Sequence, residues 1–348
     1  DNPWSNPLAW LTVVKRLIGL LVLPNHYPNM LVLEVGADKP GDLAKILKIA
    51  SPDAVVVTRL PDIPVHVEAY ASPEAVQEEE FSPAYALRAA APLIIPTGKP
   101  HLREMAERTP ARIITYGEDR SATARITHVG YHKTDHRVVG MQAHISVCDT
   151  DGKIAINGSV GKVQVLPVAA AIATAHAFSI PLAEALVALE AYIPPPGRGR
   201  LFAGKNDTIL IDDSYNASPV AVEEALETLC HFPDATRRIA ILGDMLELGR
   251  YSVQEHERIG ALALQKADLL ITVGIRSRSM EKTSGATVVH FDDSRTAADA
   301  LPSLITSGDV VLIKGSQSIR MERIVEALLS DPSDKHKLVR QNREWKAR

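Results

Sequence analysis

The feature that most constrains the fold is a regular alternation of apolar, strand-like runs with helical segments in the second half of the chain. The runs are Thr208 to Asp213, Arg238 to Asp244, Leu269 to Gly274, Thr287 to Phe291 and Asp309 to Gly315, each followed by a predicted helix of about ten residues. Such alternation predicts a doubly wound α/β domain with a parallel sheet. Ligands of these domains bind at the carboxyl ends of the strands.

The first half alternates in a similar way and then changes pattern. Its predicted strands are Met30 to Gly36, Ala54 to Thr58, Ala91 to Pro96 and Arg112 to Gly117. Its predicted helices run over 40–49 and from about Pro73 and Pro100, and two alanine-rich ones cover Pro167 to Phe178 and Pro181 to Tyr192. Between Ala124 and Gly161 short β runs are expected, with a hairpin turn at Asp149-Thr150-Asp151-Gly152. These patterns predict another parallel sheet with crossover helices.

The length of 348 residues suggests two domains, each large enough for its own core. The stiff run Pro194-Pro195-Pro196-Gly197 marks the predicted boundary between them. We therefore expect one domain over residues 1–193 and a second over 194–330. Residues 331–348 are polar and mostly basic, and we expect a frayed terminus there.

Composition excludes several classes of protein. A net charge of −4 and a pI near 6.3 argue against a general nucleic-acid binder, which needs a basic excess. Cys148 and Cys230 are far apart in the sequence, which excludes a disulfide scaffold and a cysteine zinc site and favours a reducing cytoplasm. The apolar stretch Leu8 to Pro24 carries Lys15 and Arg16 in its middle, which favours a buried or amphipathic helix over membrane insertion.

Polar residues gather where the first strand of the second domain ends. The segment from Asp212 to Pro219 reads DDSYNASP and leads into a predicted helix. Carboxylate and amide groups at a helix N-terminus can bind ribose hydroxyls, phosphate or a metal ion. The alternative is that Ser218 only caps the helix ahead of Pro219. Both can hold together, and the length of the polar run favours a site.

Two further loops follow strands of the same domain. The loop GDMLELG places Asp244 and Glu247 between two glycines, which is typical of a tight loop near a ligand and equally of an ordinary turn. Lys314 and Ser316 lie where the last strand ends. The lysine either meets an anionic group or belongs to solvated surface.

Two residues of the first half are candidate metal ligands. Glu34 stands in a predicted strand that is otherwise apolar, and a carboxylate in such surroundings needs a partner, for which a metal ion is the obvious choice. His66, just past the next strand, is a candidate to share that ion. For each residue alone the alternative is a hydrogen-bonded structural role.

A phosphate-binding loop is not found in this sequence. The nearest match, Gly158-Ser159-Val160-Gly161-Lys162, lacks the required glycine spacing, continues with Val163 and follows a predicted hairpin, so we reject it. The residues alone indicate two α/β domains with an acidic cleft linked to a nucleotide or a metal.

Three long motifs resemble the C-terminal half of the Mur ligases, and most of all their MurF type. They are LIDDSYNASPVAVEEALETL, ILGDMLELG and VLIKGSQSIRMERIVEAL. VLEVGADKPGDL, the His66 segment and PPPGRGR resemble the central domain of the family and its junction. The likeness runs from about Leu31 to Leu329. It implies a central ATPase domain followed by a Rossmann-like C-terminal domain, in a cytoplasmic ligase of peptidoglycan precursor synthesis.

The resemblance also implies a chemistry and a set of site residues. An ATP-dependent ligase of this family phosphorylates a carboxylate of a UDP-MurNAc-peptide, and the amine of an amino acid or of D-alanyl-D-alanine displaces the phosphate from the acyl phosphate. ATP and Mg²⁺ are the implied cofactors. By matching motif positions, Glu34 and His66 are implied metal ligands, and Arg198, Asp212, Asp213 and Asn216 are implied nucleotide contacts. Asp244, Glu247, Lys314 and Ser316 are implied to border the incoming substrate.

The sequence departs from the family pattern in four places. The segment QEEEF (77–81) has no lysine where relatives carry one that becomes carbamylated and helps to hold magnesium, and Glu78 or Glu80 occupies its place. Pro96-Thr97-Gly98-Lys99 stands where relatives show Asn-x-Asp-Asp. The usual His and Asn are missing near Val163 to Pro167. The phosphate loop of the family belongs upstream of residue 1.

Two hypotheses of different classes follow. The first is an ATP-dependent ligase, which the intact C-terminal motifs favour. The second is a non-catalytic pseudo-ligase that acts as a binding or partner module, which the altered central segments favour. We expect the 348-residue chain alone to be inactive as a ligase, because no phosphate loop is found in it.

Overall fold

A computed structural model describes residues 7–24, 28–283, 288–342 and 345. The chain forms two compact units, residues 1–36 and 37–348. The first unit contains helix α1 (Pro7–Val22), so a helix at Leu8 to Pro24 is confirmed, but the alternative of a buried helix is wrong, since Leu11 and Leu21 are 64% and 77% exposed. Within the described ranges, no helix combines the length and the apolar character that crossing a membrane requires.

The predicted strand from Met30 to Gly36 is wrong. These residues form no strand in the structure, and their side chains are exposed, Val32 by 87%. A buried strand needs a neighbour for its backbone N–H and C=O groups, and no strand ladder of the described residues includes this run. The argument that Glu34 sits among apolar side chains and needs a metal partner therefore loses its basis.

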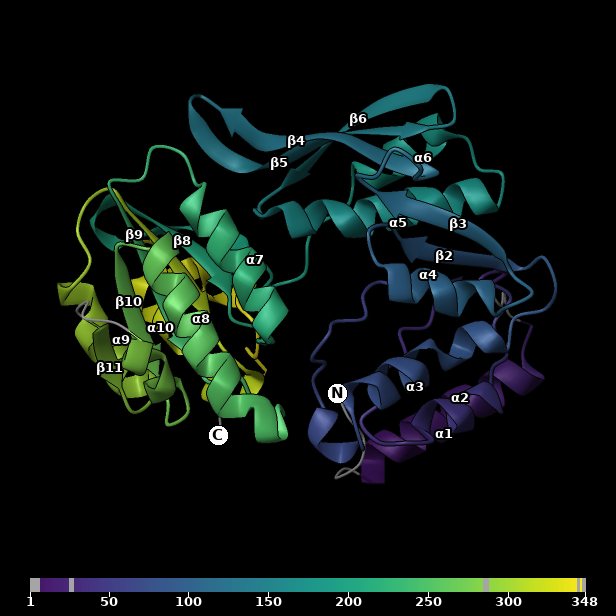
Figure 1. The fold of residues 1–348 in the computed structure, drawn as a ribbon, viewed down its shortest axis with the longest axis horizontal. Coiled ribbons are helices and arrows are strands. Elements are labelled where there is room, and N and C mark those ends of the chain that lie inside the picture. Colours follow the sequence, from purple (N-terminus) through teal and green to yellow (C-terminus); the bar gives the residue numbers. More distant parts are fainter. Residues whose placement is uncertain (1–6, 25–27, 284–287, 343–344, 346–348) are drawn as a thin grey trace. The chain divides into compact units, whose positions relative to one another are not determined.

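The first sheet of residues 37–348 has six strands in the order β1-β2-β3-β4-β5-β6 (Figure 1). Their bounds are β1 (Val55–Val56), β2 (Pro92–Pro96), β3 (Arg112–Gly117), β4 (Ala124–Thr134), β5 (Arg137–Val147) and β6 (Thr150–Asn157). The pairs from β1 to β4 are parallel, and β4, β5 and β6 pair antiparallel. The parallel part confirms three of the strands predicted for this half.

Helices cover both faces of this sheet. They are α2 (Asp42–Leu47), α3 (Pro73–Tyr85), α4 (Pro100–Glu107), α5 (Val165–Ala177) and α6 (Leu182–Leu189), as the sequence predicts. Successive side chains of a strand point to opposite faces. In β2, Ile94 therefore joins the core that contains α5, while Leu93 and Ile95 join the core that contains α3 and α4.

The hairpin turn predicted at Asp149 to Gly152 is displaced. Thr150 already pairs with Val147, so the turn consists of Cys148 and Asp149, and a second two-residue turn joins β4 to β5 at Asp135 and His136. The strands of this meander are long rather than short. The alternation of apolar residues in β5 and β6 sets the register of these strands, and the register sets the position of the turn. The turn-like composition of residues 149–152 does not reveal this register.

The second sheet has the order β11-β10-β9-β12-β8-β7. Its strands are β7 (Arg200–Gly204), β8 (Thr208–Asp213), β9 (Arg237–Gly243), β10 (Leu269–Val273), β11 (Val288–Phe291) and β12 (Asp309–Lys314). All pairs are parallel except β7 with β8. The five predicted strands are confirmed, although Thr287 lies outside the described residues, and the antiparallel edge strand β7 was not predicted.

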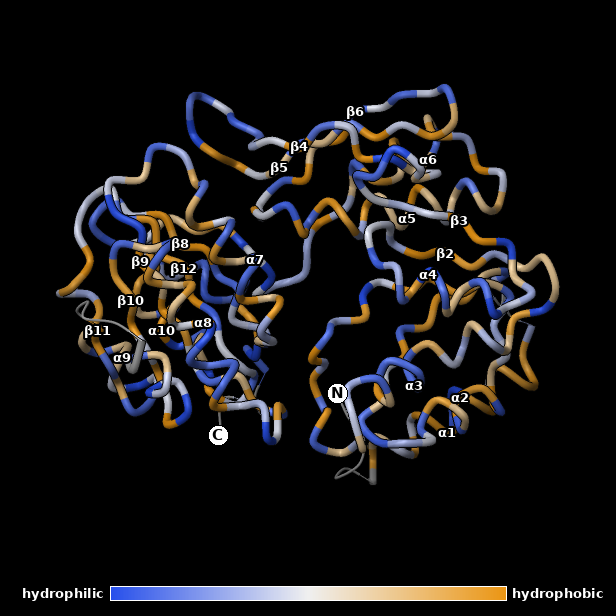
Figure 2. Tube along the Cα trace, in the orientation of Figure 1, coloured by the Kyte–Doolittle hydropathy of each residue, from blue (hydrophilic) through white to orange (hydrophobic). Residues whose placement is uncertain are grey.

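Two layers of helices enclose the second sheet. One core contains side chains of α7 (Pro219–Cys230) and α8 (Ser252–Lys266), and the other contains those of α9 (Ser294–Ala300) and α10 (Glu322–Leu328). Figure 2 shows the strands between them as mostly hydrophobic. The segment after β10 is a 3-10 helix (Ser277–Thr283) rather than the predicted α-helix. The first of these cores also includes residues of the first sheet.

The expectation of a frayed tail after residue 330 is wrong for the described part. Leu338 is buried in the core of the second sheet, and Arg340 is buried in an ion pair with Glu322. A 3-10 helix (Pro332–Lys337) leads into these residues. The polar, basic composition of this segment did not indicate that Leu338 and Arg340 attach it to the fold, the first by apolar packing and the second by an ion pair.

Candidate functional site

The carboxyl ends of β8, β12 and β9 lie side by side, because β12 pairs with both neighbours. Lys314, the last residue of β12, is in register with Asp213. Its Nζ donates to Asp213 Oδ2 at 2.6 Å and to the carbonyl oxygen of Asn216 at 3.0 Å. The lysine side chain is only 4% exposed. The alternative of a solvated surface lysine is therefore excluded.

Asp213 connects three segments at this edge. Its Oδ2 accepts from Lys314, and its Oδ1 accepts from the backbone N–H of Gly199 at 3.2 Å. A carboxylate offers about four lone-pair directions, so these two bonds leave acceptor capacity unused. Because the side chain is 19% exposed, that capacity is open to a hydroxyl group of a ligand.

Arg198 and Tyr215 form a flat platform next to Asp213. The guanidinium carbon of Arg198 lies 4.4 Å from the centre of the Tyr215 ring. The backbone N–H of Tyr215 donates to Gly197 at 3.1 Å, and Gln164 Nε2 donates to the carbonyl oxygen of Arg198 at 3.0 Å. Gln164 lies in the segment where the sequence lacks the His and Asn of the family, and its role at the junction was not predicted.

Asp212 and Asp213 are adjacent but have different surroundings. Asp212 is fully buried, and its Oδ1 accepts from the backbone N–H of Ser214 at 3.1 Å. Burial, and secondarily the nearby carboxylates of Asp213 and Glu322, raise the pKa of Asp212 to about 6. A ligand has no access to this side chain, so we leave Asp212 out of the proposed contacts.

Asn216 and Ser218 serve the turn that follows β8. Asn216 Oδ1 accepts from the backbone N–H of Ala217 at 2.9 Å, so its side chain stabilises the local turn. Ser218 occupies the N-cap position of α7 but makes no capping hydrogen bond with its side chain, and Pro219 begins the helix. The prediction that Ser218 caps the helix is therefore correct for its N-cap position, but its hydroxyl group makes no capping hydrogen bond.

Ser316 and Asp244 bind the neighbouring loops together. The backbone N–H of Ser316 donates to the carbonyl oxygen of Asp244 at 2.9 Å, and its hydroxyl accepts from Leu246 N–H at 2.9 Å. Asp244 Oδ1 accepts from the N–H of Ser277 at 2.8 Å. Both side chains are buried. They form the framework of the edge rather than an exposed contact surface.

His256 completes this framework and was missed in the sequence. It is fully buried on α8, where its Nε2 accepts from Met245 N–H at 3.0 Å and its Nδ1 donates to the carbonyl oxygen of Ser252 at 2.6 Å. Burial lowers the pKa of His256, which keeps the ring neutral. The sequence did contain a signal for His256, namely a histidine on the apolar face of an amphipathic helix.

His66 contacts the loop that carries Glu247. His66 Nδ1 lies 3.2 Å from Glu247 Oε2, and its Nε2 lies 3.5 Å from Asp38 Oδ1. Gly249 follows in the same loop with φ +50°, and a Cβ there would come within 3.0 Å of the Cβ of Glu68. The structure thus brings one predicted metal ligand next to one predicted substrate contact.

The three glutamates of 78–80 have different partners. Glu78 pairs with Arg108 at 2.7 Å and accepts from Tyr85. Glu79 accepts from two backbone N–H groups at the start of α2. Burial raises the pKa of Glu80, and His66 is the charge that opposes this shift. Of the two glutamates that the sequence left open, Glu78 pairs with Arg108, and Glu80 is the one whose pKa His66 affects.

These residues do not form a metal site by themselves. Across the ranges that the structure describes, no three His, Cys, Asp or Glu side chains are grouped to hold a metal ion. Glu34 belongs to the unit of residues 1–36 and is exposed, so its pairing with His66 stays a prediction. We therefore assign no chemical step to a metal.

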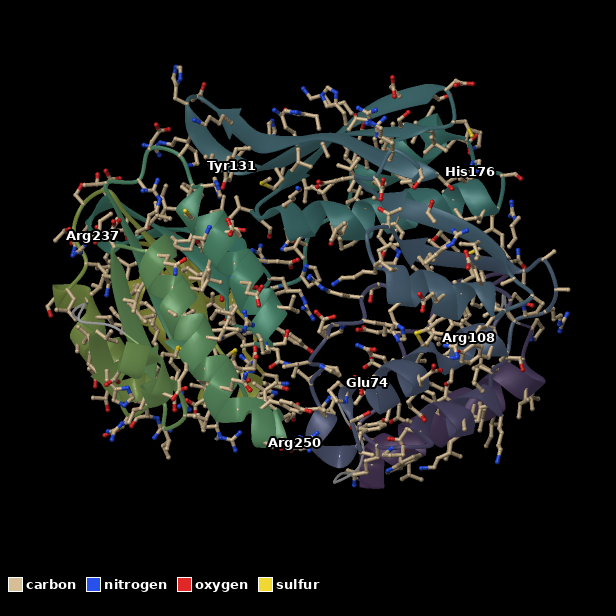
Figure 3. The ribbon with its side chains drawn as sticks, in the orientation of Figure 1. Glu74, Arg108, Tyr131, His176, Arg237 and Arg250 are labelled. Carbon is tan, nitrogen blue, oxygen red and sulfur yellow. The ribbon has the colours of Figure 1, made fainter. Side chains whose placement is uncertain are left out.

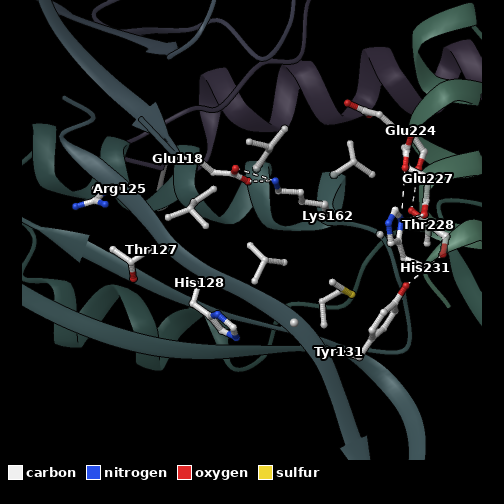
Figure 4. Close-up of a pocket in the computed structure, with 17 residues that line it drawn as sticks. Glu118, Arg125, Thr127, His128, Tyr131, Lys162, Glu224, Glu227, Thr228 and His231 are labelled. Carbon is white, nitrogen blue, oxygen red and sulfur yellow. Dashed lines mark hydrogen bonds and ion pairs between the residues drawn. The ribbon is translucent and has the colours of Figure 1, made fainter. Parts of the chain in front are cut away.

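A cavity of about 950 Å³ lies between β4, residues 161–166 and α7 (Figure 4). It has an apolar wall from Ile126, Val129 and Leu166, and the ion pair of Glu118 with Lys162 lines it. None of the site residues predicted from the sequence lines it. Two further lining residues are joined by a hydrogen bond, since the Tyr131 hydroxyl donates to the carbonyl oxygen of Thr228 at 3.2 Å (Figure 4).

Comparison with known proteins identifies both halves of the chain. The Mur ligase middle domain matches residues 18–175, and the Mur ligase glutamate ligase domain matches residues 197–317. The interval between the two matches contains the predicted boundary at residue 194, which itself stays a prediction.

The relatives are ligases. The UDP-N-acetylmuramoyl-tripeptide–D-alanyl-D-alanine ligase of Mycobacterium tuberculosis is 28% identical, over 87% of this chain and 63% of that protein. The enzyme of the same name from Bacillus subtilis is 25% identical, over 90% of this chain and 67% of that protein. This chain thus spans less than two thirds of the length of the first relative.

The fold agrees with the sequence match. The crystal structure of the MurF ligase from Thermotoga maritima in complex with ADP superposes with a TM-score of 0.74 and 25% identity, over 87% of this chain and 68% of that one. The two domain matches together span most of the sequence, in the order and with the sheets just described. The chain therefore belongs to the Mur ligase family, with a middle domain followed by a C-terminal domain.

Proposed function

We propose that this chain supplies the middle and C-terminal domains of a MurF-type ligase, which joins D-alanyl-D-alanine to a UDP-MurNAc-tripeptide with hydrolysis of ATP to ADP and phosphate. The observation that carries the proposal is the arrangement of Arg198, Tyr215, Asp213 and Lys314 at the carboxyl edge of the second sheet. The names of the relatives, and the ADP in one structural neighbour, support the same chemistry.

The arrangement fits the nucleoside part of ATP. The free acceptor capacity of Asp213 suits the hydroxyl groups of a ribose, which are hydrogen-bond donors. The Arg198 guanidinium, stacked on a tyrosine ring that is 41% exposed, offers a flat cationic surface for a base. Lys314 has a supporting role: its bonds to Asp213 and to the Asn216 carbonyl hold the carboxylate in place.

The proposed reaction has two steps. A carboxylate oxygen of the tripeptide takes the terminal phosphoryl group of ATP, which gives an acyl phosphate and ADP. The amine of the dipeptide then attacks the acyl carbon, phosphate leaves, and the proton of the amine passes to water. ATP would bring Mg²⁺ with it, since protein sites for this ion combine one or two carboxylates with substrate phosphates. Because it consumes ATP, we place the reaction in the cytoplasm.

The nucleotide contact is tested by ADP binding to the purified chain in a calorimeter. We expect Asp213→Ala to weaken ADP binding by roughly tenfold or more, because a lost hydrogen bond to a charged group is worth about 1.5–3 kcal/mol. Asp234→Ala is the control, because Asp234 is an exposed aspartate paired with Lys133. Unchanged affinity in Asp213→Ala, or no ADP binding by the wild-type chain, contradicts the proposal.

The second candidate function is a pseudo-ligase that binds nucleotide or a partner without catalysis. The specific observation in its favour concerns the segment 77–81, where Glu78 or Glu80 stands in the place of the carbamylated lysine that the family resemblance implies: Glu78 pairs with Arg108, and His66 lowers the pKa of Glu80 against the effect of burial. A turnover assay separates the two hypotheses. ADP formation that requires both tripeptide precursor and dipeptide supports the ligase. ADP binding without such turnover supports the pseudo-ligase.

A further inference from the structure

Residues Leu338, Val339 and Arg340, here named the C-terminal strap, cross the segments that carry the proposed nucleotide contacts. Leu338 is buried in the core of the second sheet, which fixes one end of the strap. Just before it, the carbonyl oxygen of Lys337 accepts from Arg200 at 3.4 Å. The strap is therefore attached to the sheet independently of the site.

Arg340 reaches the loop after β8 with its guanidinium group. Nη1 donates to the carbonyl oxygen of Ser214 at 3.1 Å and to Glu322 Oε2 at 2.8 Å, and Nη2 donates to the carbonyl oxygen of Tyr215. The side chain is 4% exposed. Its backbone has φ +58°, which is uncommon for a residue other than glycine. Such a conformation persists when the surrounding contacts hold it.

Val339 contacts the other side of the same site. A Cβ built at Gly197 would lie 2.8 Å from Val339 Cγ1 and 3.0 Å from the Tyr215 nitrogen. Gly197 precedes Arg198, and its carbonyl oxygen accepts from the N–H of Tyr215. The strap thus lies against Gly197, which precedes Arg198, and binds the carbonyl oxygen of Tyr215.

We propose that the C-terminal strap positions the nucleotide contacts, and that Arg340 is its positioning residue. The proposal rests on the function proposed above. Arg340 does not touch the ligand: it fixes the two carbonyl groups that flank Tyr215, and through them the ring on which Arg198 stacks and the turn that holds Asp213. Among the described residues, the Arg340 guanidinium is the donor that these two carbonyl groups have, so without it the loop gains freedom that nucleotide binding must then remove.

The shape of the guanidinium group makes the proposal specific. Arginine presents several donors in one rigid plane and can serve two carbonyl groups and a carboxylate at once, whereas lysine offers a single ammonium group. Arg340→Lys keeps the charge against Glu322 and loses the simultaneous contact to both carbonyl groups. A role that depends on charge alone is therefore rescued by lysine, and a positioning role is not.

Arg237 provides a matched control. It is also an arginine that binds a buried carboxylate, Asp309, with Nε at 3.0 Å, and a carbonyl oxygen, that of Leu304, at 3.0 Å. It lies at the amino ends of β9 and β12, the opposite edge of the same sheet (Figure 3). Arg237→Ala therefore reports general destabilisation without disturbance of the site.

The experiment measures amide exchange and ADP affinity in the full chain for the wild type, Arg340→Ala, Arg340→Lys and Arg237→Ala. We expect both Arg340 variants to show roughly tenfold faster exchange in peptides covering 213–217 and 197–199, and roughly tenfold weaker ADP binding. Arg237→Ala is expected to leave both unchanged. If Arg340→Ala does not fold, Arg340→Lys and Val339→Ala decide the matter by the same two measurements.

The proposal is overturned by wild-type exchange at 213–217 in the Arg340 variants, by full rescue by lysine, or by an equal effect of Arg237→Ala. If the wild-type chain binds no ADP, the proposed nucleotide site fails. The exchange measurement still decides whether the strap holds the loop. Faster local exchange with unchanged ADP affinity also counts against the proposal, because the loop would then move without consequence for the ligand.

Discussion

The carboxyl edge of the second sheet and the surroundings of His66 differ in how completely their polar groups are bonded. At the sheet edge, Lys314, Asp244 and Ser316 are buried, and each bonds within the protein. Around His66, the partners Asp38 and Glu247 are exposed and lie at 3.5 and 3.2 Å. One region is pre-organised, and the other is an open group of charges at the surface.

The difference shows how the two regions divide their tasks. Buried polar groups must find partners in the folded chain, because an unpaired one costs free energy. The sheet edge therefore stabilises the fold while it presents Asp213. The exposed groups around His66 cost little free energy when they lack a protein partner, because water solvates them. They are therefore accessible to charged ligands.

The largest effect is expected at the sheet edge. Lys314→Met leaves Asp213 without its cation and should lower the free energy of unfolding by about 3 kcal/mol or more. Lys162→Met is the matched control, because Lys162 pairs with Glu118 in an exposed position and should cost about 1 kcal/mol or less. Urea denaturation measures both. Equal losses would remove the distinction between a pre-organised edge and a surface pair.

Asp212 gives the second largest effect, with a defined pH dependence. Its pKa is raised from 3.8 to about 6, so the folded state prefers the protonated acid. The contribution of Asp212 to stability is complete below its unfolded value and is lost as the pH rises through about 6. Asp212→Asn should therefore gain about 3 kcal/mol over the wild type above that pH, by the usual conversion of a shift of about two units.

Thermal melts at about pH 4 and about pH 7.5 measure this difference, which should be small at the lower pH and favour Asp212→Asn at the higher. The exposed Asp234→Asn is the control and should show no such pH dependence, because its side chain is 81% exposed. A constant difference at both pH values would contradict the assignment of the shift to Asp212.

A third prediction concerns the histidine that supports the loop of Asp244. His256→Ala removes the acceptor of Met245 N–H and should cost about 2 kcal/mol near pH 8. Because the folded pKa of His256 is lowered, its stabilisation is present above the unfolded pKa of 6.5 and is lost as the pH falls below it. The measurement is chemical denaturation of both proteins near pH 8 and again at a pH below 6.5. The control His101→Ala, at an exposed histidine, should change stability little at either pH, and an equal cost of His256→Ala at both would refute the shift.

The smallest effect is expected around His66. Glu247→Gln alters one exposed contact, that with His66, and should change stability by about 0.5 kcal/mol or less. Gly249→Ala, two residues on, should cost about 1 kcal/mol or more, because its φ is +50° and the added Cβ would meet Glu68. Chemical denaturation ranks the two. The reverse order would mean that the charges, and not the backbone, hold this loop.

Much of the fold follows from periodicity in the sequence. Buried runs such as RIITYG and DVVLIKG have flanking helical patterns, so β3 and β12 were predictable within a residue. The rule that ligands meet the carboxyl ends of parallel strands also predicted that Lys314 and Asp213 belong to one edge. The run MLVLEVG shows the limit of the method: an apolar composition does not supply a neighbouring strand.

The site was less predictable, because its details depend on tertiary contacts. Strand alternation indicates that Asp212 and Asp213 point to opposite faces, but not which of them is buried. The choice of Glu80 over Glu78 depends on Arg108, which lies thirty positions away in the sequence. The contact of Arg340 with Ser214 joins residues 126 positions apart, and no local pattern announces it.

The strand order has a consequence for how the protein is made. β12 lies between β9 and β8, although it follows every other strand of its sheet in the sequence. During synthesis, β8 and β9 therefore leave the ribosome before the strand that must separate them, and a direct pairing of the two is a trap that has to be avoided or undone. Such non-local insertion slows folding, and it leaves Asp213 without its lysine until Lys314 has emerged.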